Sequence, residues 1–264
     1  MKLSIITCTY NSEKYLQECI DSVIAQDLNV EDYEHIFVDA YSTDSTKKII
    51  EKYMKKYSNV RLIERKPKWV YNAMNEGIKE AKWEYIMCLN SDDYLEKNAM
   101  SRYLKFVSDT WNKDLYYWKS ITIMNWNIVD ISNKNWFVYT IWRIFFYLWG
   151  KALIGHWTVL LKRDVFFELG MFDETKKISS DYWFWLNILT NKKKYVFFPY
   201  VVHYFRIHEN SLSTNWKNND LTKNEDLYMQ KKYLPRYKIV TSNFITKICY
   251  LKWKFDLSKK HKSK

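Results

Sequence analysis

The sequence predicts an α/β domain built around a mostly parallel β-sheet. Short β-branched runs alternate with segments whose apolar residues recur at helical spacing. Strands that alternate with helices form βαβ units, and the strands of such units lie parallel. The 264 residues, of which 47% are hydrophobic and 19% aromatic, are also sufficient to bury a sizeable core.

The alternation is clearest in the N-terminal third. A first strand is predicted over residues 2–9 and a first helix over 15–24, separated by the polar residues Tyr10, Asn11 and Ser12. The elements that follow are predicted as strand 35–39, helix 43–57, strand 60–64, helix 70–81 and strand 85–89. We expect these segments to form one half of the domain, over residues 1–105.

The pattern loosens after residue 105 into segments rich in Trp and Tyr. A helix is predicted over 183–189 and a strand over 195–205, and the chain becomes helical and increasingly basic from residue 220. There is no internal repeat and no clean linker. The predicted organisation is therefore one domain over 1–215, whose second half covers 106–215, and a basic helical appendage over 216–264.

Composition narrows the class of protein. Four glycines and three prolines exclude collagenous and linker-rich chains. The net charge of +12 suits nucleic acid, an anionic membrane or an anionic substrate, and does not choose among them. Cys8, Cys19, Cys88 and Cys249 lack metal-ligand spacing, which favours a reducing compartment. No charged leader with a long apolar stretch precedes the first strand, so we expect a cytoplasmic protein.

Polar residues gather where the predicted strands end, which is where open parallel sheets bind ligands. Thr9, Tyr10 and Asn11 follow the first strand, residues 39–44 the second, and residues 90–93 the fourth. The ring of Tyr10 suits stacking against a nucleotide base or packing on its own helix. Asp39 lies too far from the next helix to cap it, which favours a hydrogen bond to a base or ribose.

Asp92 and Asp93 are the strongest local signal. Adjacent carboxylates repel each other unless a cation or hydrogen-bond donors compensate, and their hard oxygens suit Mg²⁺ or Mn²⁺ bridging to phosphates. The alternative is that both residues cap a helix that begins near Glu96. Both interpretations fit the sequence.

Asp181 opens the predicted helix 183–189. Ser179 or Ser180 is able to cap this helix, which leaves Asp181 free to face a pocket as a general base. The alternative is a first-turn acid stabilised by the helix dipole. His156 and His208 stand alone in the sequence, and a lone His is more often a hydrogen-bonded structural residue than a ligand.

Taken in order, these segments resemble the family 2 inverting glycosyltransferases of the GT-A fold. The resemblance covers roughly residues 1–213 and is carried by the following segments: SIITCTYN, VDAYSTDST, VYNAMNEGI, EYIMCLNSDD, GHWTVLLKRDVF, LGMFDE, ISSDYWFW and RIHENSLS. The later segments are most similar to bacterial enzymes that extend lipid-linked polysaccharide units. The resemblance implies a Rossmann-like GT-A sheet flanked by helices, with a nucleotide-sugar half over 1–105 and an acceptor half over 106–215.

The resemblance also implies roles for individual residues. The catalytic base would be Asp181, which would deprotonate an acceptor hydroxyl as it attacks the anomeric carbon opposite the leaving diphosphate. Asp93 would ligate Mn²⁺ or Mg²⁺ together with His208. His156 and Trp157 would line the acceptor side. The donor, a nucleotide diphosphate sugar, would be held by a larger set: Thr9, Tyr10, Asn11, Asp39, Asn72, Asn75 and Asp92.

The sequence departs from the family pattern at several positions. The family usually has glycine at Ser45, Trp69 and Trp83, an acid at Asn72 and an amide at Trp157. A Trp in place of a Gly at a ligand-facing turn would narrow the donor pocket or block it. Because Asp92, Asp93 and Asp181 are all retained, we expect an active enzyme.

Two segments favour peripheral contact with an anionic membrane at the inner face of the cell membrane. Residues 136–149 place Tyr139, Arg143 and Tyr147 on one helical stripe among large apolar groups, but are shorter than the roughly 20 residues that span a bilayer. From Lys247 onward there are seven lysines against one acid. The alternatives are a buried aromatic helix and a solvated tail.

Three rival functions are weaker. A sugar nucleotidylyltransferase needs a glycine-rich phosphate loop near its N-terminus, yet the first glycine is Gly77. A non-catalytic module that binds a nucleotide sugar or a membrane is supported by the substituted glycines and the basic tail. A nucleic-acid binder would use the positive charge, but that charge is concentrated at the C-terminus and acids occupy the strand ends. The partners we expect are therefore a nucleotide sugar and a glycan or lipid-linked acceptor, without nucleic acid.

Overall fold

The structure is a computed structural model. It describes residues 2–26, 28–66, 68–110, 113–131, 156–191, 193–209, 211, 224–225 and 228. The predicted aromatic segment 136–149 lies outside the described residues. Of the predicted appendage 216–264, the described residues are Asn224, Glu225 and Tyr228, and the seven lysines counted from Lys247 lie outside them.

The N-terminal half confirms the predicted alternation of strands and helices. Its elements are β1 (Leu3–Thr9), α1 (Glu13–Ile24), β2 (Tyr33–Asp39), α2 (Thr46–Met54), β3 (Val60–Glu64), α3 (Val70–Glu80) and β4 (Tyr85–Cys88). The helix predicted over 43–57 is shorter, because the Asp44 carboxylate accepts the N–H groups of Glu13 and Thr46 at 3.1 and 2.9 Å and holds the preceding residues in a loop.

The second half adds antiparallel strands. Its elements are β5 (Tyr94–Leu95), α4 (Ala99–Asp109), β6 (Leu115–Met124), β7 (Asn127–Ile131), η1 (His156–Thr158), β8 (Val159–Lys162), α6 (Arg163–Leu169), α7 (Ser180–Thr190) and β9 (Tyr195–Ile207). Residue Asn98, and not Asp92 or Asp93, occupies the N-cap of α4. The interpretation of the two aspartates as helix caps is therefore wrong.

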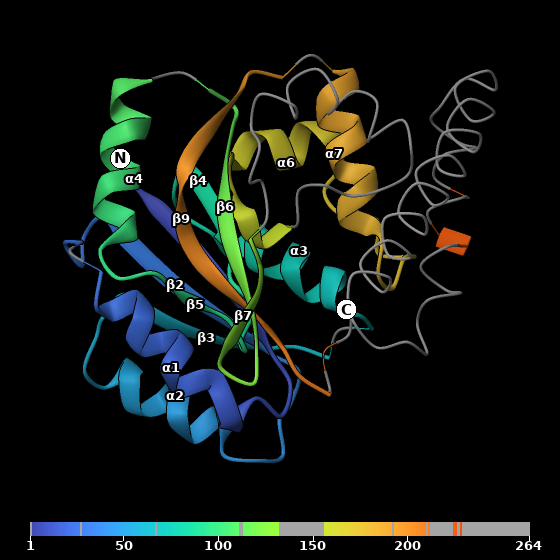
Figure 1. The fold of residues 1–264 in the computed structure, drawn as a ribbon. Coiled ribbons are helices and arrows are strands. Elements are labelled where there is room, and N and C mark those ends of the chain that lie inside the picture. Colours follow the sequence, from blue (N-terminus) through green and yellow to red (C-terminus); the bar gives the residue numbers. More distant parts are fainter. Residues whose placement is uncertain are drawn as a thin grey trace, which may run out of the picture.

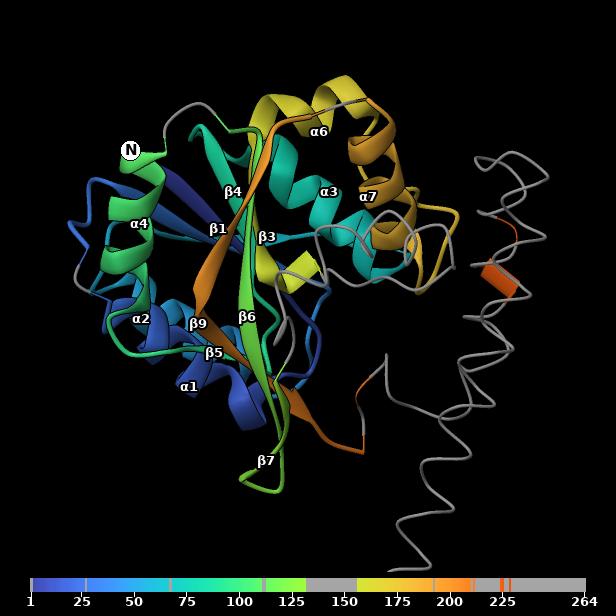
Figure 2. The same ribbon diagram turned by 45° about the horizontal axis from the view of Figure 1, so that its top comes forward.

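Within the described residues the strands form one sheet of nine, in the order β3-β2-β1-β4-β8-β6-β9-β5, with β7 paired to β6. Strands β3, β2, β1 and β4 are parallel, as are β6 and β9, whereas β8 runs antiparallel to both of its neighbours. The sheet curls so that β6 and β9 cross over the carboxyl ends of the parallel strands (Figures 1 and 2).

Helices cover both faces of the sheet. Helices α3, α6 and α7 bury their apolar residues against one face of β1, β2 and β4. Helices α1, α2 and α4 cover the other face. The approach of α3 to β1 depends on Gly77, because a Cβ atom there would lie 2.5 Å from Ile6 Cγ2. Both layers therefore hold the strand ends rigidly in place.

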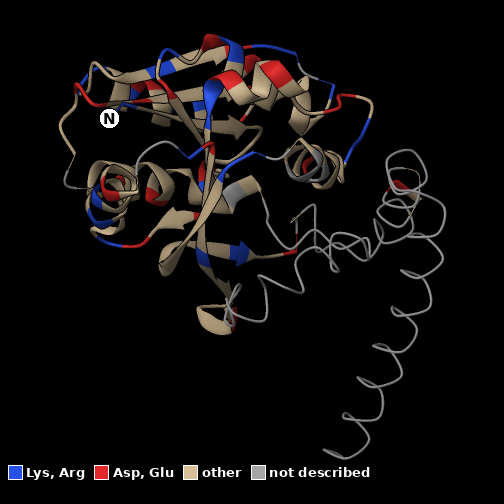
Figure 3. Cartoon of the chain, turned by 90° about the horizontal axis from the view of Figure 1, so that it is seen from above, with Lys and Arg blue, Asp and Glu red and all other residues tan. Residues whose placement is uncertain are grey.

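Acidic and basic residues are interspersed along the outer helices (Figure 3). In the part of the chain that the structure describes, no helix combines the length and the apolar character needed to cross a membrane.

Candidate active site

A pocket of about 920 Å³ lies at the carboxyl ends of β1 and β4. Its walls come from the loop after β1, the start of α3, the loop after β4, the residues before and within the first turn of α7, and the end of β9. Segments far apart in the sequence therefore meet at the sheet edge where parallel sheets bind ligands.

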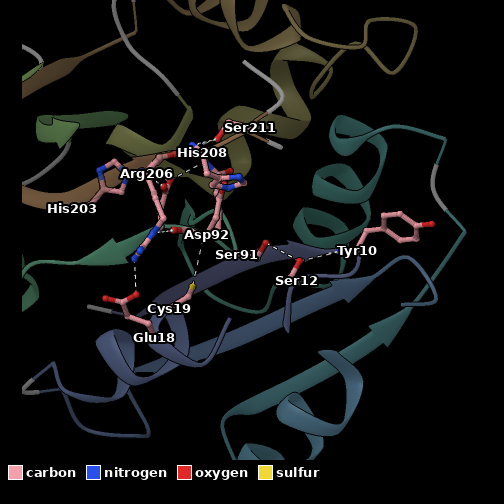
Figure 4. A network of polar contacts seen from close by, with 12 residues as sticks. Tyr10, Ser12, Glu18, Cys19, Ser91, Asp92, His203, Arg206, His208 and Ser211 are labelled. Atoms are coloured by element: carbon pink, nitrogen blue, oxygen red, sulfur yellow. Dashed lines mark hydrogen bonds and ion pairs between the residues drawn. The ribbon is translucent and has the colours of Figure 1, made fainter. Parts of the chain in front are cut away.

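The loop after β1 reaches the pocket as predicted, with Thr9, Tyr10 and Asn11 all in its lining. The ring of Tyr10 is 65% exposed and points away from the polar cluster (Figure 4). Asn11 adopts a left-handed backbone conformation with φ of 49°, and its side-chain oxygen accepts the N–H of Thr43 at 2.9 Å. This contact ties the loop after β1 to the loop after β2.

Asp39 does not line the pocket. Its side chain is fully buried and accepts hydrogen bonds from Thr9 Oγ1 at 2.8 Å, from Ser42 N at 2.8 Å and from Ser42 Oγ at 2.6 Å. Asp39 does not cap α2, whose N-cap is Ser45, which agrees with the sequence. Asp39 instead closes the turn at the end of β2, and its bond from Thr9 Oγ1 connects that turn to the end of β1.

Asn72 and Asn75 also lie outside the pocket lining. Both amides donate to the carboxylate of Glu174, at 2.7 and 2.9 Å, and Asn75 is additionally paired with the backbone of Phe172. Their described contacts connect α3 to the loop before α7. The structure therefore gives these two predicted donor residues a structural role in the free protein.

Asp92 and His208 meet at the pocket wall (Figure 4). Asp92 Oδ2 lies 2.9 Å from His208 Nε2, and the two side chains are 26% and 19% exposed. The ring of His208 also lies 5.1 Å from the ring of Tyr15. A carboxylate and an imidazole, side chains of the kinds that bind Mn²⁺, thus lie together in the pocket lining.

Asp93 points the other way and is only 1% exposed. Its carboxylate accepts the N–H of Arg206 at 2.8 Å and the side-chain amide of Asn90 at 2.9 Å, and lies 3.4 Å from His203 Nε2. Burial raises the pKa of Asp93, against the opposing effect of His203. Asp93 is therefore enclosed in this structure, and of the two aspartates Asp92 is the one that lines the pocket, so metal ligation by Asp93 stays a prediction.

Asp181 lies in the first turn of α7 and lines the pocket. Tyr71 Oη donates to Asp181 Oδ1 at 3.0 Å, and His156 Nδ1 lies 3.3 Å from Asp181 Oδ2. The other ring nitrogen of His156 lies 3.1 Å from Asn90 Oδ1. Asp181 also accepts the N–H of Tyr182 at 2.9 Å. Its carboxylate therefore bonds the first turn of α7 and also lines the pocket.

Tyr71 was not singled out from the sequence. Burial, and then the neighbouring Asp181 carboxylate, raise the pKa of its hydroxyl well above the ordinary value, so Tyr71 remains a hydrogen-bond donor. Its hydroxyl also contacts the carbonyl oxygen of Ile178. Its place in the segment VYNAMNEGI, one turn ahead of Asn75, was the available sequence signal.

Arg206 was also missed; it is buried beside the pocket residue Asp92 (Figure 4). Its Nε donates to the carbonyl of Asp92 at 2.9 Å, and its Nη2 lies 2.5 Å from Glu18 Oε2. The guanidinium lies 4.5 Å from the centroid of the Tyr15 ring, where it makes a cation–π contact. Arg206 therefore fixes the backbone that presents Asp92.

The substituted glycine positions do not close the pocket. Ser45, Trp69 and Trp83 are absent from the described residues that have positive φ, so the backbone does not require glycine there. Trp69 is part of the pocket lining, with Lys177 Nζ 4.4 Å from its ring, and Trp83 lies against Lys2. The side chain of Trp157 lies outside the described residues.

The family model for glycosyl transferase family 2 matches residues 4–169. The chain belongs to this family, and its fold is the GT-A fold of the structural neighbours. The S. aureus TarS 1-349 structure in complex with UDP-GlcNAc has a TM-score of 0.65 and 24% identity, over 80% of this chain and 60% of that one. The mannosyltransferase PcManGT from Pyrobaculum calidifontis, in complex with GDP-Man and Mn²⁺, has a TM-score of 0.64 and 16% identity, over 87% and 62% of the two chains.

Relatives matched by sequence are longer proteins. The poly(ribitol-phosphate) β-glucosyltransferase of Bacillus spizizenii is 45% identical over 112 residues, which cover 40% of this chain and 17% of the relative. The poly(ribitol-phosphate) β-N-acetylglucosaminyltransferase TarS of Staphylococcus aureus is 36% identical over 110 residues, or 41% and 19% of the two chains. These matches cover less than a fifth of either relative.

Proposed function

We propose that the protein transfers a sugar from a nucleotide diphosphate donor to an acceptor hydroxyl, with inversion at the anomeric carbon. The observation that carries this proposal is the placement of Asp181 on the wall of the pocket, between Tyr71 and His156. A carboxylate so held is suited to act as a general base. Membership of glycosyl transferase family 2 supports the same reaction.

The proposed reaction needs no covalent enzyme intermediate. The acceptor oxygen forms a bond to the anomeric carbon while the bond between that carbon and the diphosphate oxygen breaks, and the acceptor proton passes to Asp181. The hydrogen bond from Tyr71 and the contact with His156 hold the carboxylate in place for this transfer. Thr9, Tyr10 and Asn11 would contact the nucleoside, since they line the same pocket from the end of β1 and the loop after it.

A divalent metal fits the site when Asp92 replaces Asp93 in the predicted ligand pair. Asp92 and His208 would hold Mn²⁺ or Mg²⁺, and the metal would stabilise the negative charge that develops on the leaving diphosphate. Among the described residues, no group of three or more His, Cys, Asp or Glu side chains is arranged to hold a metal ion. Two protein ligands leave the remaining positions for phosphate oxygens and water.

The acceptor we propose is a phosphate-bearing or lipid-linked glycan of bacterial surface polysaccharide synthesis. Lys68 and Lys177 line the same pocket as Asp181, where their ammonium groups would attract a phosphate. Two relatives are named for poly(ribitol-phosphate) acceptors, which carry such groups. A lipid-linked acceptor at the inner face of the membrane would agree with the basic tail of the sequence.

The proposal is tested with purified protein and a panel of UDP, GDP and dTDP sugars, with Mn²⁺ or with EDTA. We expect slow Mn²⁺-dependent release of nucleoside diphosphate from one donor. A soluble ribitol phosphate oligomer, a polyprenyl-linked glycan and a neutral glycan would then be compared as acceptors. If calorimetry shows that a donor binds but is never turned over with any acceptor, the non-catalytic binding module replaces the enzyme.

A further inference from the structure

Glu225 lies far from the catalytic segments in sequence but is buried against the loop that precedes α7. Its carboxylate accepts three consecutive backbone N–H groups, those of Lys177, Ile178 and Ser179, at distances of 2.9, 3.0 and 3.0 Å. Glu225 is only 8% exposed. A buried carboxylate requires such compensation, and hydrogen bonds between N–H groups and an ionised acceptor are among the stronger ones.

The loop that Glu225 holds forms part of the pocket. Lys177 and Ile178 line it, and Asp181 follows a few residues later in the first turn of α7. On its other side the loop is held by Tyr71, whose hydroxyl contacts the carbonyl oxygen of Ile178. Glu225 and Tyr71 therefore hold the same peptide group, between Ile178 and Ser179, through its N–H and its carbonyl oxygen respectively, in the segment that leads into the proposed base.

A second contact joins the same two parts of the chain. Lys176 Nζ lies 3.9 Å from the centroid of the Tyr228 ring, within the range of a cation–π interaction. Tyr228 follows Glu225 by three residues, and Lys176 directly precedes Lys177. Two residues close together in the sequence, Glu225 and Tyr228, thus contact the consecutive residues 176–179.

We infer that Glu225 is a positioning residue for catalysis, through which the C-terminal part of the chain sets the geometry of Asp181. This inference rests on the proposed function, because it assumes that Asp181 is the base. Replacing the carboxylate with an amide would leave one acceptor oxygen for three N–H groups, place an NH2 donor against the loop and let the loop shift. Donor binding should be retained, because Thr9, Tyr10 and Asn11 lie at the end of β1 and in the loop after it, whereas Glu225 bonds residues 177–179.

The test uses the full chain with Glu225→Gln, Glu225→Asp and the matched surface variant Glu31→Gln, which changes an exposed side chain. We expect Glu225→Gln to lower kcat by roughly 10- to 100-fold, the scale of a displaced catalytic group. The KM for the donor should stay within about twofold of the wild-type value, because the contacts that bind the donor are retained. Glu225→Asp keeps the carboxylate and should restore part of kcat, and Glu31→Gln should match the wild type.

Amide hydrogen exchange tests the anchor without relying on activity. The peptide that covers residues 177–179 should exchange faster in Glu225→Gln, whereas peptides from β1 should remain protected and show that the variant is folded. Unchanged exchange over 177–179, or unchanged kcat, would overturn the inference. If the wild type turns over no donor, the proposed function fails, and the exchange result then still decides whether Glu225 holds the loop.

Discussion

The adjacent residues Asp92 and Asp93 differ in their surroundings: Asp92 lines the pocket, whereas Asp93 is buried and accepts hydrogen bonds. Substituting each residue separately tests this difference. Asp93→Ala removes the acceptor of two donors, Arg206 N and Asn90 Nδ2, from a site that is 1% exposed. Leaving a buried donor unpaired costs about 1–3 kcal/mol, so two donors give about 2–6 kcal/mol. We expect the lower part of this range, since ionised Asp93 is itself disfavoured by burial.

Asp92→Ala should behave in the opposite way. Its side chain is 26% exposed and its described side-chain partner is His208, so its loss should change the free energy of unfolding by at most about 1 kcal/mol. Activity should fall by roughly 100-fold or more, because the developing charge on the leaving group loses its stabilisation.

Urea denaturation and Mn²⁺-dependent release of nucleoside diphosphate measure the two effects separately. Asp164→Ala, an exposed change in α6, serves as the control. The reasoning is refuted if Asp93→Ala keeps wild-type stability and loses activity that excess Mn²⁺ restores, or if Asp92→Ala remains fully active.

Three further predictions concern the base, acid stability and packing. Tyr71→Phe removes the hydroxyl that donates to Asp181 and should lower kcat about tenfold at unchanged donor KM; a wild-type kcat would contradict this. Burial lowers the pKa of His35 from 6.5 to about 3, so His35 contributes stability that is complete above pH 6.5 and lost as pH falls towards 3. As the pH falls from 6.5 towards 3, the free energy of unfolding of the wild type should therefore decrease more steeply than that of His35→Gln, by about 1.4 kcal/mol per pH unit. Urea denaturation at several pH values measures both slopes, and equal slopes would contradict this prediction. Gly77→Ala should destabilise the protein by about 1–3 kcal/mol, because the new Cβ would meet Ile6 Cγ2 at 2.5 Å, and a raised urea midpoint would disprove the packing argument.

The sequence predicted the fold well because its strands and helices alternate with strong periodicity. The strand over 60–64 was predicted at its observed bounds, and α3 ends one residue before its predicted end. Strands β6 and β8 were not predicted individually, because β6 is rich in aromatic residues and carries no clear period, and the four residues of β8 are too few to show one. Their place in the sheet is decided by pairing with strands distant in the sequence, and the local pattern of apolar residues does not indicate such pairing.

The sequence was less informative about individual side chains at the strand ends. Asp92 and Asp93 are adjacent and chemically identical, and the direction of each depends on Arg206, which is more than a hundred residues away. The bonds from Ser42 to Asp39 were not predicted, because the distance of Asp39 from the next helix was considered and the turn after β2 was not. Glu225 could not be connected to the site, since neither spacing nor periodicity indicates a contact across 46 to 48 residues.

The central claim is that Asp181 takes the acceptor proton in a pocket that binds the nucleotide sugar independently of it. The most direct measurement is the rate of sugar transfer by Asp181→Asn at saturating donor and Mn²⁺, beside donor affinity from calorimetry and the control Asp164→Asn. We predict that transfer falls by roughly 100- to 10,000-fold, the usual contribution of a general base, while donor affinity and the control are unchanged. Transfer within a few-fold of the wild type, or a loss of donor binding that accounts for the loss of activity, would contradict this account.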